Sequence, residues 1–255
     1  FAAFVSLPAA MVLFFGAGWK VTLNGAILGA LLVTPSCLLI VNFVCVPLGL
    51  PAVIGNVLGM ALGSVAAFML CRRFPALVTP KYEQKPENLP ITPEKNPNYG
   101  VIWTLRRVLA DFSEAPFYGN EWASLGMLGG VLLAYALSPL SPAYGSGLLL
   151  PMLAAQALTS LVGVIVWRRQ WQIRGWYPTY VPLVSVVPAA VLTYGGDFTA
   201  MIASALLGAL IAPPLACAIA QRLPKYLHPY IGNVLSMAIS TLVIVPVIGF
   251  LTSNS

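Results

Sequence analysis

Residues Ile54–Ser64 read IGNVLGMALGS, and the chain writes this stretch a second time, at Ile231–Thr241, as IGNVLSMAIST. The two stretches share seven of eleven residues, including the whole Ile-Gly-Asn-Val-Leu run. A match of this kind indicates that one structural unit occurs twice in the chain. The repeat therefore governs how we interpret the rest of the sequence.

Two more pairs of segments extend the repeat upstream. They are Leu28–Pro35 (LGALLVTP) with Leu207–Pro214 (LGALIAPP) and, more loosely, Val5–Leu13 (VSLPAAMVL) with Val184–Leu192 (VSVVPAAVL). In all three pairs the two members lie between 177 and 180 residues apart, and the pairs follow the same order. We therefore predict a first copy of the unit within residues 1–70 and a second copy within residues 180–255.

The composition is that of an integral membrane protein. Of the 255 residues, 59% are hydrophobic and 8% are charged, and the mean hydropathy is +0.87. A soluble domain carries about 25% charged residues, so this chain has too few of them to cover a surface in water. We expect the lipid bilayer to surround it. We expect no nucleic-acid partner, because cytoplasmic loops of a membrane protein account for the net charge of +6.

Eight segments are apolar enough to be membrane spans, which need roughly 20 residues each. They cover about residues 1–18, 22–44, 50–70, 122–138, 148–167, 180–196, 198–220 and 230–251. Several are short or contain a proline, which kinks or breaks a helix. We predict an all-α polytopic integral membrane protein with about eight transmembrane helices. Because the chain opens on the apolar Phe1, we also expect further native sequence, including spans, before it.

One polar region, Arg72–Glu121, separates the third span from the fourth. Its first part is rich in charge and proline, as exposed linkers are. Its second part, VIWTLRRVLADF, places five apolar residues on one helical face: Val101, Leu105, Val108, Leu109 and Phe112. We predict a linker over residues 71–121 with an amphipathic helix at about 101–113 that lies in the membrane interface. The alternative is a buried amphipathic helix packed under the bundle.

All thirteen lysines and arginines lie in the connections that follow the odd-numbered spans, and the other connections hold none. By the positive-inside rule, the basic connections face the cytoplasm. We therefore expect a cytoplasmic linker at 71–121 and a C-terminus outside. The membrane that we expect is the plasma (inner) membrane of a bacterium.

The order of the spans predicts that the two copies are inverted relative to each other. The first copy holds spans one to three, two connecting spans cover residues 122–179, and the second copy holds spans six to eight. Matching spans are five positions apart, an odd number, so the copies cross the membrane in opposite directions. Inverted-topology repeats recur in secondary transporters, which bind their substrate near the midplane where the repeats meet.

Small residues recur every four positions in the repeated stretch. They are Gly55, Gly59 and Gly63 in the first copy and Gly232, Ser236 and Ser240 in the second. Such spacing lets helix backbones approach closely in lipid, where packing drives association. We assign these residues to helix packing and predict that the third and eighth spans are central.

Each copy also carries polar and helix-breaking residues that could line a path for a solute. They are Ser6, Pro8 and Asn56 in the first copy and Ser185, Pro188 and Asn233 in the second. A side-chain amide in an apolar span needs a partner, which is either a neighbouring helix or a substrate. A proline frees a backbone carbonyl, and unwound helices that line a cavity expose such groups to ligands. We predict these six residues as substrate-binding, with structural hydrogen bonding as the alternative for the asparagines.

Catalytic and metal-binding patterns are absent from the sequence, so we expect no enzymatic activity, no metal and no cofactor. Asp197 and the single histidine, His228, fall at the ends of segments, where we expect a solvated or capping role. No ionisable residue lies well inside a predicted span, so no proton relay is visible. Three explanations stay open: passive movement of a neutral solute, coupling to sodium through carbonyls and hydroxyls, or ionisable groups outside this chain.

The function that we expect is membrane transport. The chain would be a secondary transporter, facilitator or channel (a permease) that moves a small neutral or weakly charged solute through a midplane site between the inverted copies. The alternative is a non-catalytic membrane subunit of a larger complex, in which the repeat serves as a scaffold. A polar path lined by both copies would favour transport, and large apolar faces would favour a subunit. Both alternatives allow homo-oligomers or other membrane subunits as partners.

Overall fold

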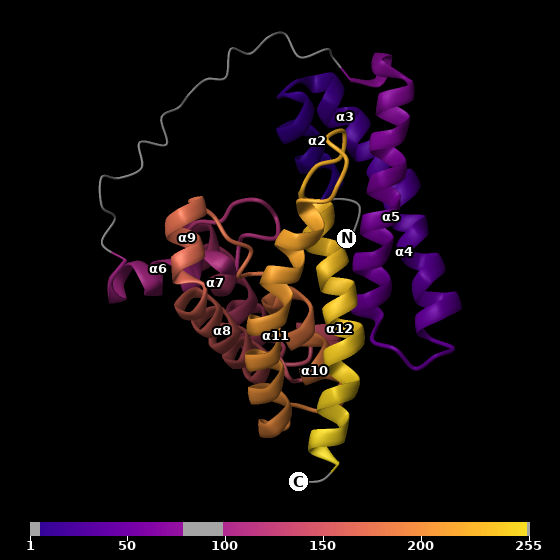
Figure 1. Cartoon of the computed structure of the whole chain (residues 1–255). Coiled ribbons are helices and arrows are strands. Elements are labelled where there is room, and N and C mark those ends of the chain that lie inside the picture. Colours follow the sequence, from indigo (N-terminus) through magenta and orange to yellow (C-terminus); the bar gives the residue numbers. More distant parts are fainter. Residues whose placement is uncertain (1–5, 79–98, 254–255) are drawn as a thin grey trace.

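The computed structural model describes residues 6–78 and 99–253. Within these ranges every regular element is a helix and no β-strand occurs (Figure 1). The expectation of an all-helical chain is confirmed for this part of the protein. The charged, proline-rich first part of the predicted linker, residues 79–98, and the beginning of the first predicted span lie outside the described residues.

The helices follow one another in three groups. The first copy contains α2 (Leu7–Phe15), α3 (Trp19–Leu28), the π-helical turn η1 (Gly29–Val33), α4 (Thr34–Ile40), the π-helical turn η2 (Val41–Cys45) and α5 (Ala52–Arg73), whose last residues enter the predicted linker. The 3-10 turn η3 (Pro75–Leu77) follows within that linker. The middle part contains α6 (Val101–Asp111), α7 (Glu121–Leu137), the 3-10 turn η4 (Ala143–Gly145), α8 (Leu149–Val166) and α9 (Arg168–Arg174). The second copy contains the 3-10 turn η5 (Pro182–Val184), α10 (Val186–Tyr194), α11 (Phe198–Ala220) and α12 (Tyr230–Thr252).

Among the described residues, five helical stretches are long and apolar enough to cross a membrane: Trp19–Cys45, Ala52–Arg73, Leu149–Val166, Phe198–Ala220 and Tyr230–Thr252. They coincide with the second, third, fifth, seventh and eighth predicted spans, and they support an integral membrane protein. The helices at the other three predicted spans are shorter, since α2 has 9 residues, α7 has 17 and α10 has 9. The total of eight spans therefore stays a prediction.

The Trp19–Cys45 stretch stays helical although Pro35 interrupts its hydrogen bonding. Pro35 has no N–H to donate to the carbonyl of Leu31, four residues earlier. Just before this proline the helix widens into η1, where the N–H of Thr34 bonds to the carbonyl of Gly29, five residues back. A single π-helical turn therefore absorbs the proline without ending the helix.

A different device accommodates the proline pair inside α11. Pro213 leaves the carbonyl of Ala209 without its usual donor. The indole N–H of Trp167, at the end of α8, donates to this carbonyl at 2.8 Å. A side chain from a neighbouring helix thus replaces the missing main-chain donor, and it ties α8 to α11.

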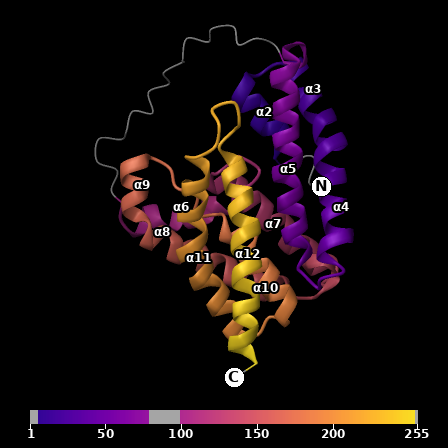
Figure 2. The same cartoon turned by 45° about the vertical axis from the view of Figure 1, so that its right-hand side comes forward.

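The two long helices of the second copy, α11 and α12, run side by side through the middle of the molecule (Figures 1 and 2). On one side α12 packs against α5, and on the other side α11 packs against α8. The hydroxyls of Ser64 on α5 and Tyr230 on α12 bond to each other, and the guanidinium of Arg72 lies 4.5 Å from the ring centre of Tyr226. The end of α5 thus meets the start of α12. The two copies of the repeated stretch therefore lie on neighbouring helices of opposite direction.

The two copies also agree in local structure where each begins. Ser6 and Ser185 precede the short helices α2 and α10, and their backbone dihedrals are similar (φ −122°, ψ −61° and φ −130°, ψ −78°). A glycine with positive φ, Gly16 or Gly195, follows each short helix, although the ψ angles differ (156° and 21°), and a long helical stretch, Trp19–Cys45 or Phe198–Ala220, comes next. The likeness between the copies therefore extends from sequence to backbone.

Helix α6 is amphipathic and turns its polar side into the protein. Thr104 and Asp111 are buried, and the side chain of Arg107 is 13% exposed. On the opposite side, Val101 and Leu105 are exposed. An exposed apolar face on a helix is typical of contact with lipid at the membrane interface. The placement of α6 relative to a membrane stays a prediction.

Candidate functional site

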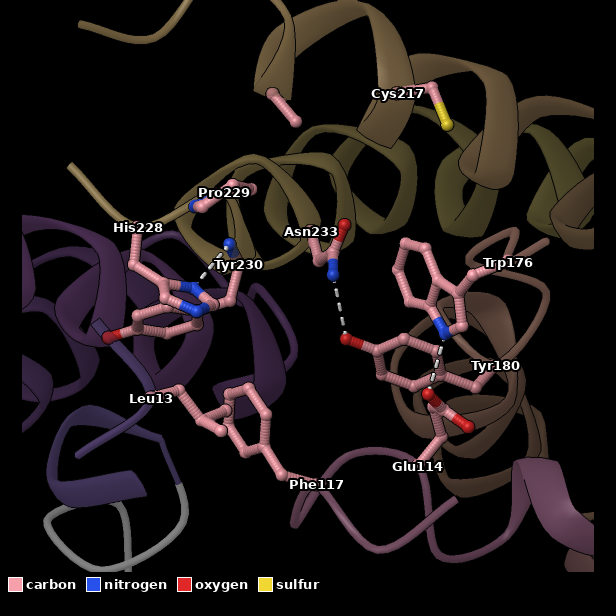
Figure 3. Close-up of a pocket in the computed structure, with 11 residues that line it drawn as sticks. Leu13, Glu114, Phe117, Trp176, Tyr180, Cys217, His228, Pro229, Tyr230 and Asn233 are labelled. Carbon is pink, nitrogen blue, oxygen red and sulfur yellow. Dashed lines mark hydrogen bonds between the residues drawn. The ribbon is translucent and has the colours of Figure 1, made fainter. Parts of the chain in front are cut away.

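A cavity of about 270 Å³ lies between the start of α12 and the segments that face it (Figure 3). Its lining comes from α2, from the segment after α6, from the segment before η5 and from the end of α11 with the start of α12. The residues are Leu13, Glu114, Phe117, Trp176, Tyr180, Cys217, Ala220, His228, Pro229, Tyr230 and Asn233. Both copies and the polar segment between them thus contribute to one cavity.

Asn233 is the predicted substrate-binding residue that lines this cavity. It is buried in the first turn of α12, and its Nδ2 donates to the hydroxyl of Tyr180 at 2.9 Å (Figure 3). The bond joins α12 to the segment before η5 across one wall. The amide thus has the protein partner that an apolar environment demands, and it still borders the cavity.

Ser6, a second predicted residue, lies near Tyr230, which lines the cavity. It is buried, and its hydroxyl has no hydrogen-bond partner among the described residues, whereas the nearby Tyr230 hydroxyl bonds to Ser64. Three hydroxyls from α5, α12 and the residue before α2 thus meet beside the cavity. Tyr230 has no counterpart hydroxyl in the first copy, where the matching position is Val53.

The other two predicted residues of the first copy are not among the described residues that line the cavity. Pro8 packs against α3, where a Cβ added to Gly25 would lie 3.1 Å from the Cα of Pro8. Asn56 is half-buried on α5, and its backbone carbonyl accepts a hydrogen bond from Cys37 Sγ at 3.1 Å. Both residues therefore take part in contacts within the first copy.

The second-copy residues Ser185 and Pro188 also lie away from the cavity lining. Ser185 is buried, and its hydroxyl donates to the carbonyl of Val181 at 2.8 Å. Pro188 is half-buried in α10. The structure thus brings Asn233 and Ser6 towards one site and places the remaining four predicted residues in separate surroundings.

The glycines assigned to packing on α5 face the Trp19–Cys45 stretch at very short range. A Cβ added to Gly55, Gly59 or Gly63 would lie 2.5 to 2.6 Å from an atom of that stretch. Real Cβ atoms are essentially never found so close to another heavy atom. At Gly59 and Gly63 the close atoms belong to the backbone, so a side chain there would require the helices to shift, whereas at Gly55 the closest atom is a side-chain carbon of Val41.

The matching positions on α12 face α11. A Cβ added to Gly232 would lie 2.6 Å from the backbone nitrogen of Ala220. Ser236 instead donates a hydrogen bond from its hydroxyl to the carbonyl of Ala212, at 2.7 Å. Ser240 is buried and donates to the carbonyl of Ser236, on its own helix, at 2.5 Å.

A buried ionic cluster lies beside the cavity, at the end of α6. Arg107 donates to Asp111 Oδ1 at 2.9 Å and to Glu114 Oε2 at 2.6 Å, so one guanidinium serves two carboxylates. Asp111 also accepts hydrogen bonds from Ser160 on α8, at 2.6 Å, and from Thr179, at 3.2 Å. The cluster therefore fixes α6 against α8 and against the segment that leads to η5.

Glu114 joins this cluster to the cavity. Its Oε1 accepts the indole N–H of Trp176 at 2.7 Å (Figure 3), and both residues line the cavity. Sequence reasoning missed Glu114 and Asp111 because their partners lie 62 and 49 positions away, in segments with no shared pattern. The signal that could have found the cluster was the spacing of Arg107 and Asp111, four residues apart on the polar face of an amphipathic helix.

Burial raises the pKa of Asp111 to about 6, against the opposing effects of Arg107 and of the hydrogen bonds from Ser160 and Thr179. Removing a charged carboxylate from water costs free energy, so burial favours the neutral, protonated form. For Arg107, burial acts against the charged form, but Asp111 and Glu114 together raise its pKa, so the guanidinium stays charged. The cluster can therefore take up one proton, on Asp111, near pH 6.

The two ionisable residues at segment ends have capping roles, as expected. Asp197 accepts the backbone N–H of Ala200 at 2.9 Å and caps the start of α11. His228 Nδ1 accepts the backbone N–H of Tyr230, at the start of α12, at 3.1 Å. Burial lowers the pKa of His228 to about 4, so its ring is neutral at pH 7.

The described residues contain no cluster of three or more histidine, cysteine, aspartate or glutamate side chains that could hold a metal ion. Comparison with protein-family models, with curated proteins and with solved structures finds no match to this chain. The functional interpretation therefore rests on the site itself.

Proposed function

We propose that this chain is a membrane transport protein, a secondary transporter or facilitator, that moves a small neutral or weakly charged solute. The observation that carries the proposal is the cavity at which the two copies meet. It takes Leu13 from the first copy and Tyr230 and Asn233 from the second. Ligand sites of transporters lie where two repeats face each other, near the bilayer midplane. This cavity lies between the copies but at the end of α11 and the start of α12, which differs from the midplane position that we expected.

The arrangement of the copies supports the same proposal. The repeated stretches lie on α5 and α12, which are antiparallel, and the short helices α2 and α10 begin with similar backbone dihedrals. Neighbouring copies of one unit that run in opposite directions are what an inverted-topology repeat requires. We infer that spans one to three and six to eight form such a repeat.

The proposed orientation has the basic connections, including the linker, in the cytoplasm and the C-terminus outside, in a bacterial plasma membrane. Arg72, the α11–α12 connection with Tyr226, and Arg174 beside Tyr177 lie towards one end of the helices, where α5 and α11 end. Single cysteines at Leu48 and Lys225, both exposed, test this orientation in a chain without other cysteines. An impermeant thiol reagent added to intact cells should label position 48 and spare position 225. Equal labelling of the two positions would contradict the proposal that the repeats are inverted.

Transport is tested with the purified protein in liposomes and a panel of radiolabelled small solutes, with and without a sodium gradient. For any solute that is taken up, Asn233→Ala should reduce the initial rate about tenfold, because the side chain borders the cavity. Asn42→Ala is the matched control, since Asn42 is exposed and donates within its own helix, to the Leu38 carbonyl. A loss of folded protein that equals the loss of uptake in Asn233→Ala would assign Asn233 to packing alone.

A second candidate function, a non-catalytic subunit of a membrane complex, is favoured by the surface of α7. Among its large side chains, Trp122, Leu133 and Leu137 are between 62% and 80% exposed. A Cβ added to Gly126 or Gly130 would meet no atom within 4 Å. Small residues with open space around them are suited to contact with another membrane helix. Native mass spectrometry of the protein extracted in mild detergent would distinguish the two functions, since a stoichiometric foreign subunit is expected only for the second.

A further inference from the structure

The cavity is walled mainly by aromatic rings: Phe117, Trp176, Tyr180, His228 and Tyr230. The ring centre of Phe117 lies 6.1 Å from that of His228 and 5.9 Å from that of Tyr230, so these three rings form one corner. Trp176 and Tyr180 stand across the cavity from this corner (Figure 3). The faces of Trp and Tyr attract cations, most strongly where water is excluded.

The ionisable groups of the lining favour a positive ligand over a negative one. Glu114 is the acidic residue of the lining, and none of the described lining residues is a lysine or arginine. Glu114 shares Arg107 with Asp111, so the three side chains carry a net charge of −1 when both carboxylates are ionised. The two hydrogen bonds to Glu114 leave further acceptor positions on its oxygens.

Among the described residues, two further basic side chains lie near the cavity, His228 and Arg174, and of these only His228 is in the lining. His228 is uncharged at pH 7, and its Nδ1 already accepts a backbone N–H. Arg174 is not among the described lining residues, but its guanidinium lies 5.8 Å from the ring centre of Tyr177 and is close enough to Cys217 to interact with that thiol electrostatically. The end of α11 and the start of α12 both border the cavity, and their opposite partial charges offset each other.

We propose that this cavity binds a small organic cation, a substituted ammonium ion whose apolar groups contact the rings and whose charge faces Glu114. This inference rests on the proposed function, because it names the class of solute for that site. A volume of about 270 Å³ holds roughly nine non-hydrogen atoms, at the ~30 Å³ that a water molecule occupies in the liquid. Small quaternary and tertiary amines are of this size.

Binding is tested by thermal unfolding of the purified protein in detergent with choline as the probe. Two molecules of similar shape serve as matched ligands: the uncharged isostere of choline, with carbon in place of nitrogen, and the anion tert-butylacetate. Choline should raise the unfolding temperature in a saturable manner, because it binds the folded state alone. The inference is overturned if the uncharged isostere or the anion stabilises the protein as much as choline does, or if choline has no effect.

The location of the bound cation is tested through Cys217, which lines the cavity. Cys37, Cys45 and Cys71 are buried elsewhere and are replaced by alanine, so that one thiol remains. Choline at ten times its Kd should slow alkylation of Cys217 by about tenfold, since it occupies the space beside the thiol. Choline that stabilises the protein but leaves the alkylation rate unchanged binds elsewhere, which overturns the assignment to this cavity.

Two pairs of variants separate the cavity from the rest of the surface. Trp176→Leu and Glu114→Gln should abolish the stabilisation by choline and the protection of Cys217. Trp122→Leu and Glu121→Gln are the matched controls, because these residues lie on α7 and are not among the lining residues. Equal effects of a test variant and its control would contradict the proposed contacts.

Uptake into liposomes distinguishes failure of this inference from failure of the proposed function. Binding of choline without uptake of choline or of any other solute would remove the transport proposal and leave the cation site. Uptake of another solute that choline does not inhibit would contradict the cation site and would leave the transport proposal in place.

Discussion

The two copies of the repeat pack their long helices by different chemistry. In the first copy α5 approaches the Trp19–Cys45 stretch so closely that a Cβ on Gly59 would lie 2.5 Å from the Cα of Cys37. In the second copy Ser236 occupies the matching place and donates a hydrogen bond to α11. The second copy also borders the ionic cluster, because α8 carries Ser160 to Asp111 and packs on α11. At this position the motif supports a steric contact in the first copy and a polar contact in the second, while Gly232 of the second copy keeps a close steric contact with Ala220.

The largest loss of stability is expected when a side chain is introduced where α5 contacts the Trp19–Cys45 stretch. Gly59→Leu places a side chain against the backbone of Cys37, so the two helices must separate, and we expect a destabilisation of about 3 kcal/mol or more. The measurement is the free energy of unfolding in mixed detergent micelles. Gly130→Leu on α7 is the control, because a Cβ there meets no atom within 4 Å, and we expect a change below about 0.5 kcal/mol. Similar losses in both variants would show that α7 is also packed in the folded state.

The second-largest effect that we expect is a pH dependence of the stability, which Asp111 of the ionic cluster causes. The pKa of Asp111 rises from 3.8 to about 6 on folding, so the native state binds more protons between these pH values. The contribution of Asp111 to stability is therefore full below about pH 4 and falls by about 3 kcal/mol as the pH rises through 6. Asp111→Asn should remove this fall.

Unfolding free energies of the parent and of Asp111→Asn, measured from about pH 4 to about pH 7, test the expectation. The lowered pKa of His228 acts in the opposite direction, since its stability contribution grows with pH between about 4 and 6.5. Both proteins contain His228, so the difference between their profiles isolates Asp111. Parallel profiles would mean that Asp111 does not titrate in this range.

The smallest loss of stability is expected when the hydrogen bond from Ser236 to α11 is removed. Ser236→Ala removes the donor to the Ala212 carbonyl and leaves the backbone spacing unchanged, so we expect a loss of about 1 kcal/mol. Unfolding under the same conditions gives the value. A loss as large as that of Gly59→Leu would show that the two copies pack in the same way after all.

Much of the fold follows from local patterns in the sequence. Apolar runs locate the long helices because a bilayer span needs many consecutive apolar residues. The 3.6-residue period of Val101, Leu105 and Val108 locates α6. Of the candidate site, Asn233 was found because an amide in an apolar span is costly without a partner.

The remainder of the site depends on contacts that no local pattern records. Glu114 and Asp111 belong to a charged stretch that resembles a solvated linker, and their partners are distant in the chain. Glycines gave a second difficulty, because Gly59 on α5 and Gly130 on α7 belong to the same kind of small-residue spacing. One faces a backbone and the other faces open space, and the spacing alone does not distinguish them.

The bond between Ser64 and Tyr230 has a consequence for biosynthesis. These residues are 166 positions apart, and ribosomes add roughly 5–20 residues per second, so α5 is made roughly ten to thirty seconds before its partner. During that interval α5 has the Trp19–Cys45 stretch, which precedes it directly, as its neighbour. The glycine contact can therefore close first, as a helical hairpin in the nascent chain. The cavity is completed only when α12 arrives beside α5.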